Sequence, residues 1–101
     1  MIIYNVTTKV NWTIHHYWLQ WMKEKHIPQM LETGCFFEYK ILRLLEVDEE
    51  EGPTYAIQYH ASTIENYHTY IHQYAVSLRQ HTHEKWGEQI IAFRSLLEVL
   101  H

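Results

Sequence analysis

Two kinds of hydrophobic pattern alternate along the chain, and their order constrains the fold more than any other feature. Apolar side chains recur at helical spacing in residues 13–26 and 64–85. Four other segments are rich in β-branched and aromatic residues, which is typical of strands. These segments are residues 2–10, 35–47, 54–60 and 90–100. The sequence therefore predicts the order strand, helix, strand, strand, helix, strand.

Local signals mark the ends of the two predicted helices. Asn11 is placed to start the first helix, and Pro28, which has no backbone N–H, is expected to stop it. Ser62 and Glu65 have the spacing of a capping box at the start of the second helix. Gly87 is expected to end that helix, because glycine readily adopts the backbone conformation of a helix C-terminus.

This order of elements is that of the ferredoxin-like βαββαβ fold, an α+β architecture. Right-handed crossovers would place both helices on one face of a four-stranded antiparallel sheet and leave its other face bare. With 101 residues and a mass of 12.4 kDa, the chain has room for one hydrophobic core. We therefore expect residues 1–101 to form a single ferredoxin-like domain.

The predicted strands are apolar on both faces, whereas a sheet covered on one side only should alternate apolar and polar residues. In the last strand, for example, Ile91 and Phe93 share one face while Ile90 and Ala92 share the other. A monomer rarely exposes so large an apolar patch. The sequence therefore predicts a homodimer in which a second, identical sheet covers the bare face about a two-fold axis.

Charge and composition exclude several classes of partner. The net charge of -4 and the scattered positions of the eight Lys and Arg residues argue against nucleic-acid binding. The first residues lack the features of a signal peptide, and no apolar run approaches the roughly 20 residues of a membrane span. Cys35 is the only cysteine, so no disulfide can form within the chain. We expect a cytoplasmic protein with no membrane contact.

Several short motifs are familiar, and together they run over nearly the whole chain. They are Ile3-Tyr4-Asn5-Val6-Thr7, Trp18-Leu19-Gln20-Trp21-Met22, His26-Ile27-Pro28, Thr33-Gly34 and Phe93-Arg94-Ser95-Leu96-Leu97-Glu98-Val99. In these motifs the chain resembles domain-of-unknown-function family number 4286. The resemblance implies membership of the dimeric α+β barrel superfamily, in which two sheets pack face to face. It implies no activity for the family itself.

His26 is the leading candidate for a catalytic residue. It follows Met22 by one helical turn and directly precedes Ile27 and Pro28, at the edge of the apolar stripe. A neutral imidazole there could act as acid, base or ligand in a pocket between helix and sheet. The alternative is a structural role, in which His26 caps the helix end and donates to a free carbonyl group.

Asn5, Arg43 and Arg94 are polar residues on strands that are otherwise apolar. A buried arginine needs a partner, and an anionic ligand would suit the guanidinium group. A structural carboxylate such as Glu38 or Glu98, or a contact across the dimer, would serve equally and is the more common arrangement.

Aromatic side chains could line a ligand pocket between the helices and the sheet, although at these spacings they could simply form the core. They are Trp12, Trp18, Trp21, Tyr67, Tyr70 and Tyr74. Taken together, the pattern predicts a site for a small apolar or aromatic ligand. The residues expected to contact that ligand are Asn5, Trp18, Met22, His26, Arg43, Tyr59 and Arg94.

The nine histidines invite a metal interpretation that the pattern does not favour. His68 and His72 stand four residues apart on the second predicted helix, and His81 and His83 follow near its end. No further ligand motif joins them, so we expect only weak adventitious metal binding and no dedicated metal or cofactor site. The acidic segment Asp48–Glu51 is interpreted as a solvated hairpin tip without chemistry.

Three functions remain open, and the sequence favours a dimer that binds a small molecule. The superfamily includes cofactor-independent monooxygenases and haem-degrading enzymes, and the resemblance implies that Asn5 would match an asparagine of the latter. The second predicted helix carries Tyr or smaller residues where those enzymes have Trp, which argues against haem chemistry. No complete catalytic constellation can be assembled. A purely structural or protein-interaction dimer is the third possibility.

Overall fold

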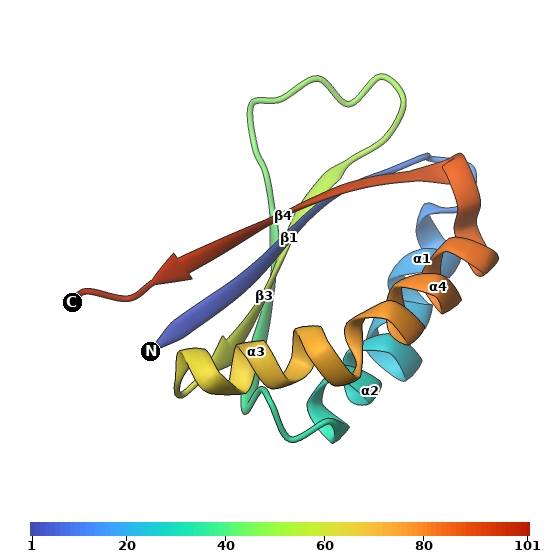
Figure 1. Ribbon diagram of the computed structural model, residues 1–101. Helices are drawn as coiled ribbons and strands as arrows, with labels where there is room; N and C mark the ends of the chain where they lie inside the picture. The colour runs from blue at the N-terminus through green and yellow to red at the C-terminus, as the bar shows by residue number, and fades with distance from the viewer.

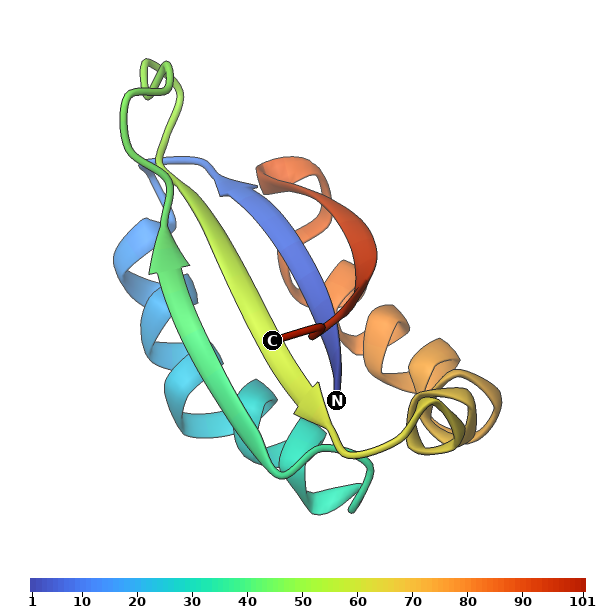
Figure 2. The same cartoon turned by 90° about the vertical axis from the view of Figure 1, so that its left-hand side faces the viewer.

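Four antiparallel strands form one sheet in the computed structural model, which describes all residues from 1 to 101. They are β1 (Ile2–Val10), β2 (Glu38–Arg43), β3 (Thr54–Ala61) and β4 (Ile90–Glu98), in the spatial order β2-β3-β1-β4. This is the predicted ferredoxin-like arrangement, with β1 and β3 at the centre and β2 and β4 at the edges. The sheet twists strongly, and β4 curls along the side of β1 (Figure 2).

The helical segments all cover the same face of the sheet (Figure 1). The first connection contains α1 (His15–Trp21), a π-helical turn η1 (Met22–His26) and α2 (Ile27–Glu32), which follow one another without a break. The second contains α3 (Ile64–Gln73), α4 (Ala75–Trp86) and a short 3-10 turn η2 (Gly87–Gln89). No helix in the structure is long and apolar enough to cross a membrane.

Pro28 does not end the first helix, contrary to the sequence prediction. In a regular α-helix its ring would clash with the carbonyl group four residues earlier. Here the turn before it is widened into η1, in which the N–H of Ile27 donates to the carbonyl of Met22, five residues back. The wider turn accommodates Pro28 at the start of α2, and the helical path continues to Glu32.

The second helix also differs from its prediction. The N-cap is Thr63 rather than Ser62, and its hydroxyl accepts a hydrogen bond from the backbone N–H of Asn66. Tyr74, which has φ -125° and ψ -30°, interrupts the helix and separates α3 from α4. Gly87 ends α4 as predicted, with a positive φ of 56°.

The hairpin between β2 and β3 has a longer connection than the sequence indicated. Strand β2 was expected to span residues 35–47 but ends at Arg43, and Glu46 adopts a positive φ of 57° that is incompatible with a strand. The connection returns to the sheet at Gly52 and Pro53, where the carbonyl of Pro53 accepts a hydrogen bond from Val10 at 2.9 Å.

The hydrophobic core lies between the sheet and the helices and is unusually aromatic. The Tyr4 ring on β1 stacks on that of Phe36 at 5.9 Å between centroids and meets that of Tyr70 on α3 at 5.4 Å. Trp18 on α1 is 1% exposed and stacks on Tyr55. These ring contacts pack both helical connections against the two central strands. The packed helices and strands form the walls of a pocket.

The other face of the sheet has no helix over it. Apolar side chains are exposed toward its edges, including Leu42, Phe93 and Ile91, which is 69% exposed. The strand pairing places a polar row across its middle. That row consists of Lys40, Gln58, Asn5 and Ser95. The bare face is therefore mixed, rather than uniformly apolar as the sequence suggested.

Candidate functional site

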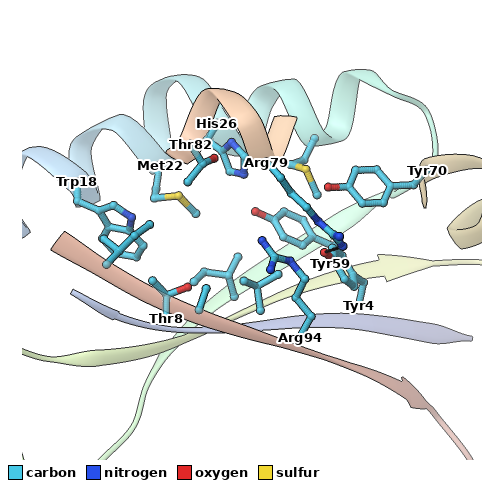
Figure 3. A pocket seen from close by; sticks show the side chains of 15 residues that line it. Tyr4, Thr8, Trp18, Met22, His26, Tyr59, Tyr70, Arg79, Thr82 and Arg94 are labelled. Carbon is cyan, nitrogen blue, oxygen red and sulfur yellow. Dashed lines mark hydrogen bonds between the residues drawn. The ribbon is translucent and has the colours of Figure 1, made fainter. Parts of the chain in front are cut away.

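A pocket lies between the helices and the part of the sheet that carries β4 (Figure 3). Successive side chains of a strand point to opposite faces, so it is the even-numbered residues of β1, such as Tyr4 and Thr8, that line this pocket. The helical connections supply the opposite wall. Polar groups are common among the lining residues. They belong to Tyr4, Thr8, Trp18, His26, Tyr59, Tyr70, Arg79, Thr82 and Arg94.

His26 is held at the pocket by the π-helical turn. Its ring stacks on that of Trp21, with 4.8 Å between centroids and 20° between the planes. The Nδ1 atom is buried and has no hydrogen-bond partner in the protein. Burial, and after it the positive charge of Arg94, lowers the pKa of His26 to about 4. The imidazole is therefore neutral at pH 7.

Two arginines point into the same pocket from opposite sides. Arg79 comes from α4 and donates from Nη2 to the hydroxyl of Tyr4 at 2.9 Å, while its Nε is buried without a partner. Arg94 rises from β4 at the more exposed side of the pocket (Figure 3). Neither guanidinium group lies within 4.0 Å of a carboxylate. No Asp or Glu is among the residues that line the pocket.

Two tyrosine hydroxyls add neutral hydrogen-bonding groups. Burial, and to a lesser extent neighbouring tyrosines, raises the pKa of both Tyr59 and Tyr70. Both hydroxyls are therefore protonated at neutral pH and can donate. Figure 3 shows the Tyr59 hydroxyl directed into the pocket above the guanidinium group of Arg94.

The cavity is small, with a volume of about 50 Å³. A single water needs roughly 10–15 Å³ by this kind of measure, and a cavity that binds benzene has roughly 150 Å³. The space therefore suits a group of a few non-hydrogen atoms. Arg94 lines the cavity and is exposed, so a longer molecule could extend toward solvent beside it.

The structure brings together five of the seven residues named from the sequence and leaves two elsewhere. The five that line the pocket are Trp18, Met22, His26, Tyr59 and Arg94. Asn5 points to the bare face of the sheet, where its Nδ2 donates to Thr7 at 3.0 Å. Arg43 is exposed near the end of β2 and does not border the pocket.

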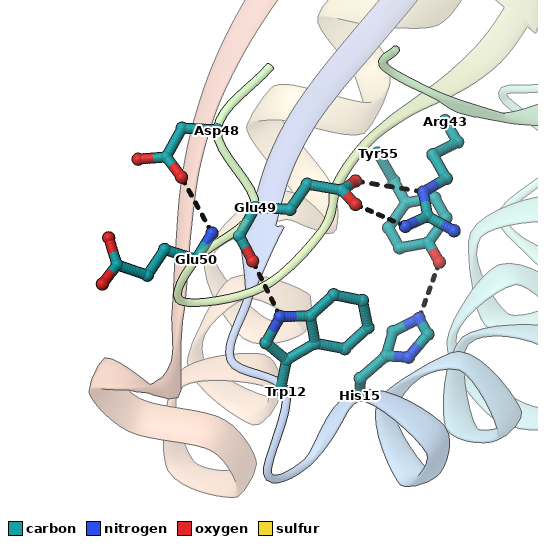
Figure 4. Close-up of polar contacts among 7 residues, drawn as sticks. All are labelled: Trp12, His15, Arg43, Asp48, Glu49, Glu50 and Tyr55. Atoms are coloured by element: carbon teal, nitrogen blue, oxygen red, sulfur yellow. Dashed lines mark hydrogen bonds and ion pairs between the residues drawn. The ribbon is translucent and has the colours of Figure 1, made fainter. Parts of the chain in front are cut away.

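Arg43 takes part in a set of contacts that fix the β2–β3 connection (Figure 4). Its guanidinium group binds Glu49 through two hydrogen bonds of 3.1 and 2.6 Å. The indole of Trp12 donates to the carbonyl of Glu49 at 2.8 Å, and His15 contacts the Tyr55 hydroxyl at 2.6 Å. The carboxylate partner of Arg43 is therefore Glu49, not Glu38 or Glu98 as the sequence suggested.

The segment Asp48–Glu51, interpreted as a solvated hairpin tip, is exposed at three of its four residues, and Glu49 is half-buried. The side chain of Glu49 binds Arg43 at the end of β2, and its carbonyl group accepts a hydrogen bond from Trp12 in the turn before α1. Trp12, which the sequence placed in the pocket or core, is 46% exposed and lies against this connection instead.

Sequence reasoning missed several lining residues, above all Tyr4 and Arg79, whereas Tyr70 was among the aromatic residues expected to line a pocket. Tyr4 was detectable, because it alternates with Asn5 and so faces the opposite side of β1. Arg79 was harder to find, because a charged side chain beside an apolar stripe is usually solvated. Arg79 and Thr82 follow Ala75 by four and seven residues, so the three side chains share one face of α4.

No group of three or more His, Cys, Asp and Glu side chains is placed to hold a metal ion. His68 and His72 are both exposed on α3, and Cys35 is buried as a free thiol.

The fold and the pocket together define the class of protein. It is a small α+β protein with ferredoxin-like strand order and a polar pocket between helices and sheet. The family model described as "Domain of unknown function (DUF4286)" matches residues 1–100, and the chain belongs to this family. Comparison with curated proteins and with solved structures gives no match.

Proposed function

We propose that this protein binds a small molecule in the pocket between its helices and β4. The observation that supports this best is a pair of buried polar atoms that the protein leaves without partners, Nδ1 of His26 and Nε of Arg79. Burying a polar atom without a hydrogen bond costs about 1–3 kcal/mol, so folded proteins rarely keep two in one pocket without a use for them. Both atoms belong to residues that line the cavity.

The volume of the cavity limits the size of the ligand that can bind in it. At about 50 Å³ it has roughly a third of the volume that holds benzene. The geometry therefore favours a group smaller than the aromatic ligand that the sequence suggested. A monooxygenase-like activity would require an aromatic substrate to enter this space, and His26 with a pKa of about 4 is a weak base at neutral pH.

Filling the cavity tests the proposal. Ala92 lines the pocket on β4, and the change Ala92→Leu would place a larger side chain in it. A library of small polar fragments is screened by nuclear magnetic resonance against the wild-type protein. We expect hits that shift signals of pocket residues and that weaken at least tenfold in Ala92→Leu.

A matched control places the same substitution on the other side of the sheet. Ala56 on β3 is half-buried and faces the side without helices, so Ala56→Leu should leave fragment binding unchanged. Fragments that bind equally well to the wild type and to Ala92→Leu would contradict the proposed site.

We further propose that the protein is a homodimer in which a second copy covers the bare face. Exposed Leu42, Ile91 and Phe93 on that face support a buried contact, as do Asn5 Oδ1 and His60 Nε2, which are buried without partners. The same face carries Glu38 and Lys40 two residues apart on the edge strand. A two-fold axis would let the acidic group of one copy meet the basic group of the other.

Sedimentation equilibrium at micromolar concentration tests the dimer directly. We expect twice the 12.4 kDa mass of one chain. A mass of 12.4 kDa would contradict the dimer without affecting the pocket proposal.

A further inference from the structure

We propose that the ligand of this pocket is an anion with a planar oxyanion head, such as a carboxylate, held between Arg79 and Arg94. This inference rests on the proposed function, because it names the chemical class that the pocket would bind. It is carried by the charge of the lining residues, by the donors that face the cavity and by the size of the space.

Charge is the first step of the argument. Arg79 and Arg94 both line the pocket, and no lining residue is acidic. Neither guanidinium group forms an ion pair in the protein, whereas Arg43 binds Glu49 through two hydrogen bonds. Two positive charges that face one cavity repel each other, and an anion between them would relieve that repulsion.

The donors around the cavity are the second step. The Nε–H of Arg79 is buried and has no acceptor. The hydroxyls of Tyr59 and Tyr70 remain protonated, so each can donate to an oxygen atom of the ligand. A carboxylate accepts several hydrogen bonds with its two oxygens, and the planar fork of a guanidinium group matches its geometry.

Size is the third step. A volume of about 50 Å³ is enough for a head of three or four non-hydrogen atoms and too small for an aromatic ring. Methyl and aliphatic groups of the ligand would meet Met22 and Ile90, which also line the pocket. The same head could be a free small anion or the end of a longer molecule whose chain passes Arg94 toward solvent.

Acetate is the probe that tests the inference, with acetamide as its neutral counterpart of the same shape. Both are titrated into the full-length protein at constant ionic strength, and the Nε–H signals of Arg79 and Arg94 are followed by nuclear magnetic resonance. We expect saturable shifts with acetate at millimolar concentration and at least tenfold weaker binding of acetamide. Removing one charge-assisted partner typically weakens binding by about tenfold or more.

Three variants with matched chemistry complete the experiment. Arg79→Gln and Arg94→Gln should each weaken acetate binding about tenfold or more, while Arg43→Gln, outside the pocket, should leave it unchanged. Arg94 is exposed on an edge strand, so its variant is expected to fold even if Arg79→Gln does not. Acetate binding that is unaffected by Arg94→Gln would overturn the inference.

The outcomes separate this inference from the proposed function. Equal binding of acetate and acetamide would overturn the anion site and leave the small-molecule pocket standing. If neither acetate nor acetamide shifts the signals at concentrations up to 100 mM, the anion site is overturned. If the fragment screen also yields no hits, the small-molecule pocket is overturned as well. If butanoate binds more tightly than acetate, the ligand is a longer carboxylic acid. If butanoate binds more weakly, the ligand is a free small anion. Both outcomes uphold the inference.

Discussion

At the scale of single residues, His26 is a titratable group whose environment differs strongly from water. It sits inside a helical path rather than at a helix end, so the structural role expected from the sequence, capping the last carbonyls, does not apply. Its ring is packed on Trp21, and the nearby charge is the positive charge of Arg94. Both burial and this charge disfavour the imidazolium form.

This environment predicts a pH dependence of stability that belongs to His26. The pKa is about 4 in the folded protein and about 6.5 in the unfolded chain, so the unfolded chain binds more protons between these values. The free energy of unfolding is therefore expected to fall as the pH drops from 6.5 to 4, by up to about 3 kcal/mol from this residue. Urea denaturation at a series of pH values measures it.

The variant His26→Phe keeps an aromatic ring against Trp21 and removes the titrating group. As the pH drops from 6.5 to 4, the free energy of unfolding of His26→Phe should fall less than that of the wild type. His72→Phe, at an exposed position on α3, serves as the control and should follow the wild type. Parallel profiles for the wild type and His26→Phe would show that His26 is not the residue responsible.

At the scale of elements, the residue types predicted the positions of strands and helices more accurately than the residues at which they end. Strand β1 coincides with its predicted range, and the order of all strands and helical connections is confirmed. Pro28 misled the prediction because a π-helical turn removes the clash that normally stops a helix, and the hydrogen bonding of that turn is not encoded in a simple motif. The break at Tyr74 likewise has no proline or glycine to announce it.

The β2–β3 connection requires a glycine at one position, and the sequence alone could not reveal this. Gly52 passes so close to β1 that a Cβ atom at this position would overlap the carbonyl oxygen of Val10. The same stretch of β1 donates a hydrogen bond from Val10 to Pro53, which keeps the two segments together. Only glycine allows this approach without movement of the backbone.

Gly52→Ala is therefore expected to destabilise the protein by about 2–3 kcal/mol, the usual cost of forcing extra volume into a closely packed position. The midpoint of urea denaturation measures the loss. Glu50→Ala, at an exposed position of the same connection, should change stability by less than about 0.5 kcal/mol. Equal stability of Gly52→Ala and the wild type would contradict the close approach.

At the scale of the whole molecule, the sequence predicted the two layers correctly but could not divide polar residues between the faces of the sheet. Asn5 and Arg94 looked equivalent as polar residues on apolar strands. The register places Arg94 at the pocket and Asn5 on the bare face, because side chains alternate along each strand. Arg79 joined the site through a contact with Tyr4 across 75 positions of sequence, which no local pattern reports.

The bare face supplies the prediction that concerns the molecule as a whole. Phe93 is 63% exposed on the edge strand β4, and its row runs across the sheet through Thr7 and Ala56. A charge placed there would be buried without a partner in a face-to-face dimer but would remain solvated in a monomer. Phe93→Glu is therefore expected to sediment as a single chain, and its melting temperature should not depend on protein concentration.

Val76 provides the matched control for this change. It lies on α4, away from the bare face, and at 78% exposed it is as accessible as Phe93. Val76→Glu should therefore keep the dimer mass and the concentration-dependent melting temperature of the wild type. If Phe93→Glu also keeps both, the bare face is not the contact between copies. The buried Asn5 and His60 atoms on that face would then be satisfied within a single chain by solvent.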